Sequence, residues 1–165
     1  HVFRVINGVL VGKSKKAGHS KVDFSAEHWE TETWNRRTIE EYSDENRKAL
    51  DQYASRLELL CTLTRTFGST PVYITQANSR GFDRGKQFEY SRALGNESAY
   101  ALRALNNATM NACRSCSRAI CIDMARELRF ESSDYYDTAH NTPAGATKIG
   151  RYLANKMAGM VGSTQ

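Results

Sequence analysis

The spacing of apolar and polar positions predicts a helix and then a strand at the start of the most clearly patterned region, residues 43–160. From Ser43 or Asp44 onward, apolar residues recur at helical intervals while charged residues occupy the opposite face. Gly68 is expected to end this helix. The segment 72–76 is β-branched and aromatic, so it predicts a strand, and a polar loop follows it.

A second helix and a second strand follow in the same order. Apolar residues on one stripe predict a helix over 97–116, and the apolar run within 118–123 predicts a short strand. A turn or short helix is expected at 124–128. The last helix is expected to begin with Thr142 as its N-cap and Pro143 at its first position, where both residue types are favoured.

Three other segments show weaker patterns. Residues 1–12 carry apolar positions interrupted by glycine and predict a short helix. Residues 13–42 are polar and are interpreted as a long connecting loop, and residues 82–93 as a mobile insertion. At 165 residues the whole chain is long enough for one domain and too short for two.

The order helix, strand, helix, strand, helix predicts an α/β fold with a parallel sheet. Both strands are apolar enough to require helices above and below them. Two strands alone would leave apolar edges unpaired, so further strands are expected from a segment before His1 or from a partner chain. Apolar residues recur directly after His1, and no basic-then-apolar signal peptide is visible before them. We interpret this as a processed or truncated start.

Composition and charge argue against several classes of protein. The chain is 40% hydrophobic with two prolines, which favours a folded domain, and its apolar runs are too short to span a membrane. The net charge of +5 is mild, and acidic residues closely follow the basic cluster of Lys13, Lys15, Lys16 and Lys21. We expect a solvated loop of mixed charge and no nucleic-acid partner, with contact to an anionic lipid or polymer as the alternative.

The four cysteines are Cys61, Cys113, Cys116 and Cys121. The pair at 113 and 116 has the two-residue spacing of zinc ribbons and redox dithiols, but a second ligand pair for zinc is absent from the sequence. Cys121 lies inside an apolar run, where a buried thiol behaves as a small hydrophobe. Structural thiols are the preferred interpretation, and one disulfide or a metal site are the alternatives.

Asp137 and His140 carry the clearest chemical signal. An Asp three residues before a His on a short turn can bond one imidazole nitrogen and fix the tautomer. The other nitrogen can then take a proton from a nucleophile, which is the base-and-orienter half of a serine-hydrolase triad. A suitable nucleophilic serine is not evident in the sequence. The alternative is that Asp137 caps its turn and His140 packs against the last helix.

The Asp137 to His140 element, followed five residues later by Gly145 inside the last helix, resembles the C-terminal part of an SGNH hydrolase. This superfamily includes the GDSL lipases and esterases. The resemblance covers residues 43–160 and implies a three-layer, flavodoxin-like parallel sheet and a Ser-His-Asp triad that hydrolyses acyl or acetyl esters. The family's Gly-Asp-Ser motif and its Gly-x-Asn-Asp block are missing here, so the serine and the oxyanion donors are expected outside this chain.

Gln76 and Asn78 leave the C-terminal end of the first predicted strand, on the side where His140 is expected. We predict that they bind substrate, and Arg80 would then meet an anionic group; closure of the loop on its own backbone is the equal alternative. The expected substrate is a small-molecule, lipid or carbohydrate ester, with no cofactor and no metal. A non-catalytic binding or scaffolding module with an SGNH-like fold is the alternative function.

Overall fold

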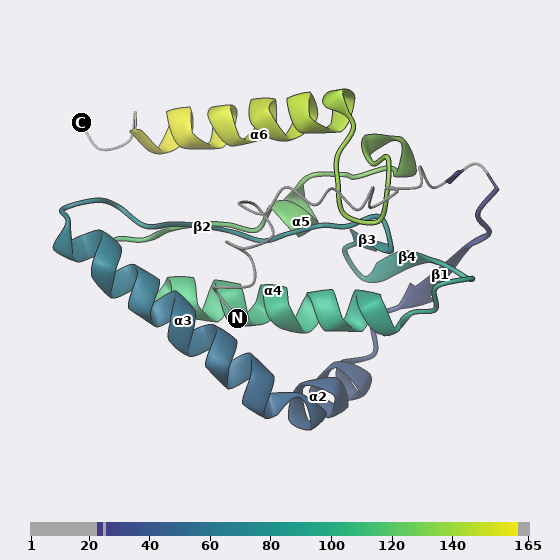
Figure 1. Ribbon diagram of the computed structural model, residues 1–165, viewed down its shortest axis with the longest axis horizontal. Helices are drawn as coiled ribbons and strands as arrows, with labels where there is room; N and C mark the ends of the chain where they lie inside the picture. The colour runs from purple at the N-terminus through teal and green to yellow at the C-terminus, as the bar shows by residue number, and fades with distance from the viewer. Residues whose placement is uncertain (1–22, 25, 162–165) are drawn as a thin grey trace, which may run out of the picture.

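The computed structural model describes residues 23, 24 and 26–161 and has a mixed α/β architecture (Figure 1). The short helix predicted over 1–12 lies outside the described residues. Across the described ranges, no helix combines the length and the apolar content needed to cross a membrane. In chain order the elements are β1 (Trp29–Thr33), α2 (Arg36–Glu45), α3 (Arg47–Thr66), β2 (Val72–Ile74), β3 (Gly81–Arg84), β4 (Gln87–Ser91), α4 (Glu97–Ser115), β5 (Ile120–Ile122), α5 (Met124–Glu127), the 3₁₀ turn η1 (Ser132–Asp134) and α6 (Pro143–Val161).

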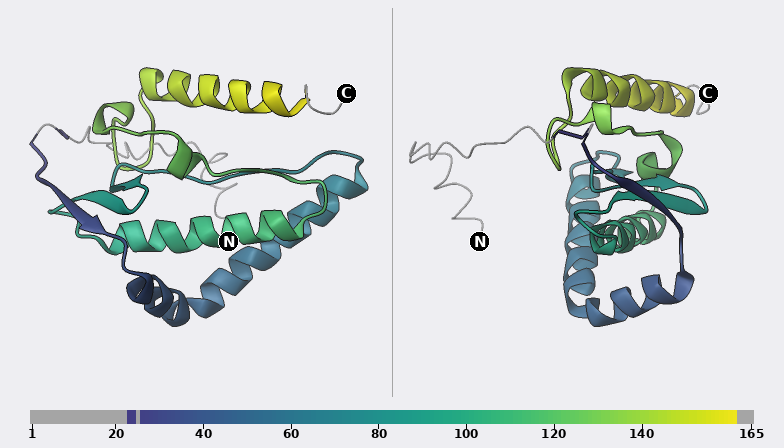
Figure 2. Two further views of the ribbon diagram at one scale, coloured as in Figure 1. Left: turned by 180° about the vertical axis from the view of Figure 1, so that it is seen from behind. Right: turned by 90° about the vertical axis from the view of Figure 1, so that its right-hand side faces the viewer.

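The two strands predicted from the apolar runs, β2 and β5, pair in parallel, as expected. The register places Val72 opposite Ile120. Thr75 extends the pairing past the end of β2, since its backbone N–H donates to the carbonyl of Ile122 at 3.0 Å. Helix α4 lies along one face of the pair and α6 along the other, so these strands have helices on both sides (Figures 1 and 2).

A separate antiparallel sheet has the strand order β1-β4-β3. The interpretation of residues 82–93 as a mobile insertion is therefore wrong. Strand β4 alternates in the manner of a half-buried strand, with Phe88 and Tyr90 buried. At the hairpin turn Gly85 adopts a φ of +82°, and its backbone N–H donates to Asp83 Oδ1 at 2.8 Å.

The described part of residues 13–42 also contains regular structure, so the prediction of a long connecting loop is wrong for that part. Strand β1 forms there because it pairs with the edge of β4. Helix α2 begins where the side-chain Oδ1 of Asn35 accepts the N–H groups of Arg37 at 2.9 Å and Thr38 at 3.4 Å. This is an ordinary N-cap, which the sequence interpretation missed.

The helix predicted to begin at Ser43 or Asp44 is divided into α2 and α3. The division falls at Asn46, whose side chain donates to the carbonyl of Tyr42 at 2.9 Å. The helix end predicted from Gly68 is confirmed: α3 stops just before it, and Gly68 has a φ of +72°. Helices α4 and α5 match the predicted 97–116 and 124–128 segments closely.

The predicted start of the last helix is confirmed. Pro143 is the first residue of α6, and the hydroxyl of Thr142 accepts the backbone N–H of Gly145 at 3.1 Å. Helix α6 packs its apolar side, including Ile149 and Leu153, onto the cluster that contains Ile122. The beginning of α6, and with it the preceding loop, is thereby fixed relative to the parallel strands.

The preferred interpretation of the four cysteines as structural thiols is wrong, because all four form disulfides. Cys61 of α3 is bonded to Cys116 after α4, and Cys113 of α4 is bonded to Cys121 of β5. The two cysteines of the short motif are thus joined to different partners and not to each other. They share a core cluster with Tyr73 that ties both helices to the strands.

Candidate active site

The loop between η1 and α6 brings Asp137 and His140 together. The imidazole Nδ1 of His140 lies 2.7 Å from Asp137 Oδ2 and 3.0 Å from Oδ1. An ionised carboxylate can only accept a hydrogen bond, so Nδ1 carries the proton in this pair. The neutral ring then has its lone pair on Nε2, the nitrogen that a general base uses in a triad.

Backbone groups of the same loop keep Asp137 ionised. The N–H groups of Ala139 and His140 donate to its Oδ1 at 2.8 and 2.7 Å. The bond from Ala139 is the largest cause that lowers the pKa of Asp137, from 3.8 to about 2; the bonds from His140 add to it, and burial opposes it. Asp137 therefore remains charged beside the imidazole over the whole neutral and mildly acidic range.

The two side chains differ in their access to solvent. The Asp137 side chain is 11% exposed, whereas the His140 side chain is 53% exposed. Tyr136 stacks on the imidazole with ring centroids 5.6 Å apart and an interplanar angle of 15°. The carboxylate is thus buried behind a histidine that one aromatic ring supports and that a substrate can reach.

A closed loop holds this pair in place. The backbone N–H of Tyr136 donates to the carbonyl of His140 at 3.1 Å, and Tyr135 and Asn141 form a bridge just outside it. From the segment after β2, the buried hydroxyl of Ser79 donates to the Asp137 carbonyl at 3.0 Å. Ser79 is a positioning residue that the sequence interpretation missed, because it lies 58 positions before its partner.

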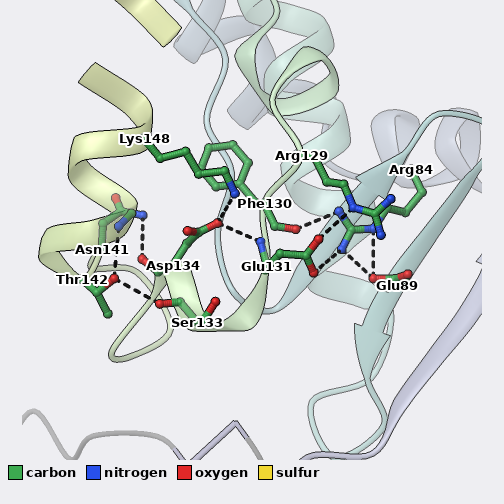
Figure 3. Close-up of polar contacts among 11 residues, drawn as sticks. Arg84, Glu89, Arg129, Phe130, Glu131, Ser133, Asp134, Asn141, Thr142 and Lys148 are labelled. Carbon is green, nitrogen blue, oxygen red and sulfur yellow. Dashed lines mark hydrogen bonds and ion pairs between the residues drawn. The ribbon is translucent and has the colours of Figure 1, made fainter. Parts of the chain in front are cut away.

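Asp134, at the end of η1, joins the loop to the first turns of α6 (Figure 3). Its Oδ2 accepts Lys148 Nζ at 2.6 Å and the backbone N–H of Glu131 at 2.9 Å. Its carbonyl accepts the backbone N–H of Thr142 at 2.8 Å. Gly145 packs directly against this carbonyl, which leaves no room for a Cβ. This contact explains why position 145, five residues after His140, is a glycine.

A second set of polar contacts ties the segment before η1 to the β3–β4 hairpin (Figure 3). Arg84 of β3 donates to Glu89 at 2.7 and 2.9 Å and to the carbonyl of Phe130 at 2.8 Å. Its Nη2 also lies 3.5 Å from Glu131 Oε2. The Arg84 side chain is 13% exposed, so these bonds are largely shielded from water. The hairpin therefore fixes the segment that leads into η1.

Gln76 and Asn78 lie in different surroundings. The backbone N–H and carbonyl of Gln76 are both paired with the Asn106 side chain, at 3.0 and 2.7 Å, and Gln76 lines a small pocket beside α4. The Oδ1 of Asn78 accepts the backbone N–H of Arg80 at 3.0 Å, so this side chain closes its own turn. Arg80 itself is exposed.

Comparison with family models, with curated proteins and with solved structures finds no match to this chain. Within the described part of the chain, no group of three or more His, Cys, Asp or Glu side chains is arranged to hold a metal ion. The geometry of the Asp137–His140 loop is therefore the basis for a functional inference.

Proposed function

We propose that this chain supplies the general base and the orienting carboxylate of a serine ester hydrolase. One observation carries the proposal: a buried, ionised Asp137 contacts Nδ1 of a half-exposed His140. Both residues lie on the loop that leads into α6. A carboxylate in this position fixes the tautomer and stabilises the imidazolium that forms during the reaction. The expected substrate is an acyl or acetyl ester of a small molecule, lipid or carbohydrate.

The first half of the proposed reaction, which forms an acyl-serine, has two proton transfers. His140 Nε2 takes the proton of a serine hydroxyl as its oxygen forms a bond to the ester carbonyl carbon. When the carbonyl reforms, the bond to the alcohol oxygen breaks, and the imidazolium gives its proton to that oxygen. Water then repeats the sequence on the acyl-serine and releases the acid. None of these steps requires a cofactor.

The serine and the oxyanion donors are proposed to lie on polypeptide outside this chain. Ser79 is an unsuitable nucleophile, because its hydroxyl is fully buried and donates to a backbone carbonyl. Among the described residues, β2 and β5 each pair with one strand only. Further parallel strands, from a preceding segment or a partner chain, would complete a three-layer, flavodoxin-like sheet and would bring the serine to its carboxyl edge.

The test uses the protein with its natural upstream sequence or partner. A fluorophosphonate probe should label one serine, and the protein should hydrolyse p-nitrophenyl acetate. His140→Gln and Asp137→Asn should each lower kcat/KM by a factor on the order of 10⁴. The matched control is His28→Gln, since His28 is exposed and precedes β1.

Unchanged turnover in His140→Gln would overturn the assignment of the base. A complete protein with neither probe labelling nor turnover would instead favour the alternative, a non-catalytic binding or scaffolding module.

A further inference from the structure

Large apolar side chains near the end of α3 are exposed on one face of the helix. They follow each other at intervals of three and four residues, so they form a single stripe. Between 46% and 82% of each side chain is exposed in Leu59, Leu60, Leu63 and Phe67. A different face of α3 packs on the core through Leu57 and Cys61. Single apolar residues are common on surfaces, whereas a contiguous exposed stripe marks a site that meets another apolar surface.

The stripe runs into one end of the fold, which we call the α3 tip. The α3 tip consists of residues 63–72, from the end of α3 to the start of β2, and residues 114–119, between α4 and β5. The N–H of Ile120 donates to the carbonyl of Pro71 at 2.9 Å, and the Cys61–Cys116 disulfide joins the two helices beside it. The tip lies at the amino ends of β2 and β5, at the opposite end of the fold from the loop before α6 (Figures 1 and 2). Strands that extend the sheet would lie beside β2 and would leave its end uncovered.

The charged side chains of the α3 tip are all positive. Arg65, Arg114 and Arg118 are exposed, and across the described residues none of the three takes part in a salt bridge. The segments 59–72 and 110–120 contain no Asp or Glu, although the chain has 18 acidic residues. By the helical repeat, Glu58 stands about 100° or more around α3 from every residue of the stripe. The tip is therefore apolar and cationic, and it calls for an anionic surface.

The size of the α3 tip indicates what kind of surface this is. A stable protein interface takes about 20–30 residues from each partner, which is more than the tip contains. A second copy of the chain would also bring the same arginines against these. A bilayer is different, because a few protruding apolar side chains and nearby cations are enough for attachment to its surface.

We propose that the α3 tip binds the surface of a membrane that contains anionic lipids. Leu63 and Phe67 enter the boundary between the headgroups and the acyl chains, and Phe67, which directly precedes the turn at Gly68, is the most exposed of them. The arginines lay their aliphatic stems along this apolar surface and hold the lipid phosphates with their guanidinium groups. In this orientation the loop with His140 faces water, since it lies at the other end of the fold (Figure 1).

Co-sedimentation with lipid vesicles tests the proposal on the complete protein that the esterase assay uses. Binding should be at least about tenfold stronger to vesicles of phosphatidylcholine and phosphatidylserine than to vesicles of phosphatidylcholine alone, because the arginines meet anionic headgroups. Raising the salt from about 0.1 M to about 1 M shortens the Debye length from about 10 Å to about 3 Å and should reduce this preference.

Two variants separate the charged and the apolar contributions. Arg65→Gln combined with Arg118→Gln should weaken binding to the anionic vesicles about 20-fold, since each arginine near such a surface contributes about fivefold. Phe67→Ser should weaken binding at least about tenfold, because it removes the most exposed ring. All three positions are exposed, so urea denaturation should show folded proteins of nearly wild-type stability.

The matched controls change exposed residues away from the α3 tip. Arg80→Gln combined with Arg92→Gln removes the same amount of charge, after β2 and after β4. Leu94→Ser removes an apolar side chain that is 43% exposed. Both controls should bind the anionic vesicles as the wild type does.

A fluorescent variant tests insertion directly. Phe67→Trp should keep the affinity, and its new emission should shift to shorter wavelength on anionic vesicles and be quenched by lipids with brominated acyl chains. Leu94→Trp is the control and should show neither change in its added emission.

Three results would overturn the proposal. The first is equal vesicle binding by the wild type and both tip variants, which would assign the binding to another surface such as the basic cluster at 13–21. The second is an indole at position 67 that brominated lipids do not quench. The third is a dimer in sedimentation that Phe67→Ser abolishes, which would assign the stripe to a second copy of the chain. His140→Gln should bind vesicles normally, so the membrane site and the proposed hydrolase can fail independently.

Discussion

Gly145 and Asp134 lie so close together that no side chain fits between them. A Cβ placed on Gly145 would stand 2.9 Å from the carbonyl carbon of Asp134 and closer still to the oxygen. Real Cβ atoms do not approach backbone atoms to this degree. The glycine lets the first turn of α6 pack against the backbone at the end of η1. This contact holds the two ends of the His140 loop close together in space.

Gly145→Ala should therefore separate the two backbones and disturb the His140 loop. We expect a loss of about 1–3 kcal/mol in the free energy of unfolding, measured by urea denaturation, and lower ester turnover in the complete protein. The matched control is Gly150→Ala in the same helix, where a Cβ would meet nothing within 4 Å. That variant should gain about 0.5–1 kcal/mol. A gain in both variants would contradict the packing argument.

The carboxyl of Asp137 should titrate at about pH 2 and not near its ordinary 3.8. Because the folded pKa is the lower one, the stabilisation from this group is complete above the ordinary value and is lost as the pH falls toward 2. The side-chain carboxyl carbon can be followed by NMR through this interval. Removing the imidazole by His140→Ala should raise the Asp137 pKa only in part, since Ala139 still donates to the carboxylate. Titration of the wild-type group at 3.8 or above would contradict the prediction.

Ser79→Ala should loosen the loop from the segment after β2. The variant removes the hydrogen bond that the Ser79 hydroxyl donates to the Asp137 carbonyl, and we expect a cost of about 1–3 kcal/mol by urea denaturation. Ser55→Ala is the control, because the Ser55 hydroxyl also donates to a backbone carbonyl but lies on the exposed face of α3. The Ser55 variant should stay within about 0.5 kcal/mol of wild type. Equal costs for the two variants would remove the positioning role of Ser79.

The two disulfides should contribute unequally to stability. In the chain-entropy description, the 55-residue separation of Cys61 and Cys116 corresponds to about 4 kcal/mol, and the 8-residue separation of Cys113 and Cys121 to about 2.5 kcal/mol. Paired Cys→Ser variants, unfolded in urea, test this order.

Iodoacetamide should not alkylate any of the four cysteines in the unreduced native protein, as judged by intact mass.

Local chemistry explains which parts of this protein could be predicted. The start of α6 follows from Thr142 and Pro143, which act within one turn. The contact of Asp137 with His140 follows from a spacing of three residues. The β3–β4 hairpin also has a local signal in the sequence. Phe88 and Tyr90 are two residues apart, with polar residues on either side, and this alternation indicates a half-buried strand. The prediction of a mobile insertion over 82–93 was therefore wrong although the local pattern favours a strand.

Other features depend on residues that meet only in the folded chain. The bond from Ser79 to Asp137 spans 58 positions, and Cys61 finds Cys116 across 55. The two-residue spacing of Cys113 and Cys116 even suggests a dithiol that the fold does not form. The β1 strand is polar and is defined by the edge of β4 that it joins, so its own sequence carries little signal.

The crossed partners of Cys113 and Cys116 have a consequence for how the chain matures. Four cysteines allow three complete pairings, and the nearest neighbours in sequence meet most often in a reduced, unfolded chain. The disulfide expected to form fastest, between Cys113 and Cys116, is thus absent from the native protein. Oxidation in air alone should trap molecules with scrambled bridges, whereas a glutathione buffer or a disulfide isomerase should release them and raise the yield of native protein.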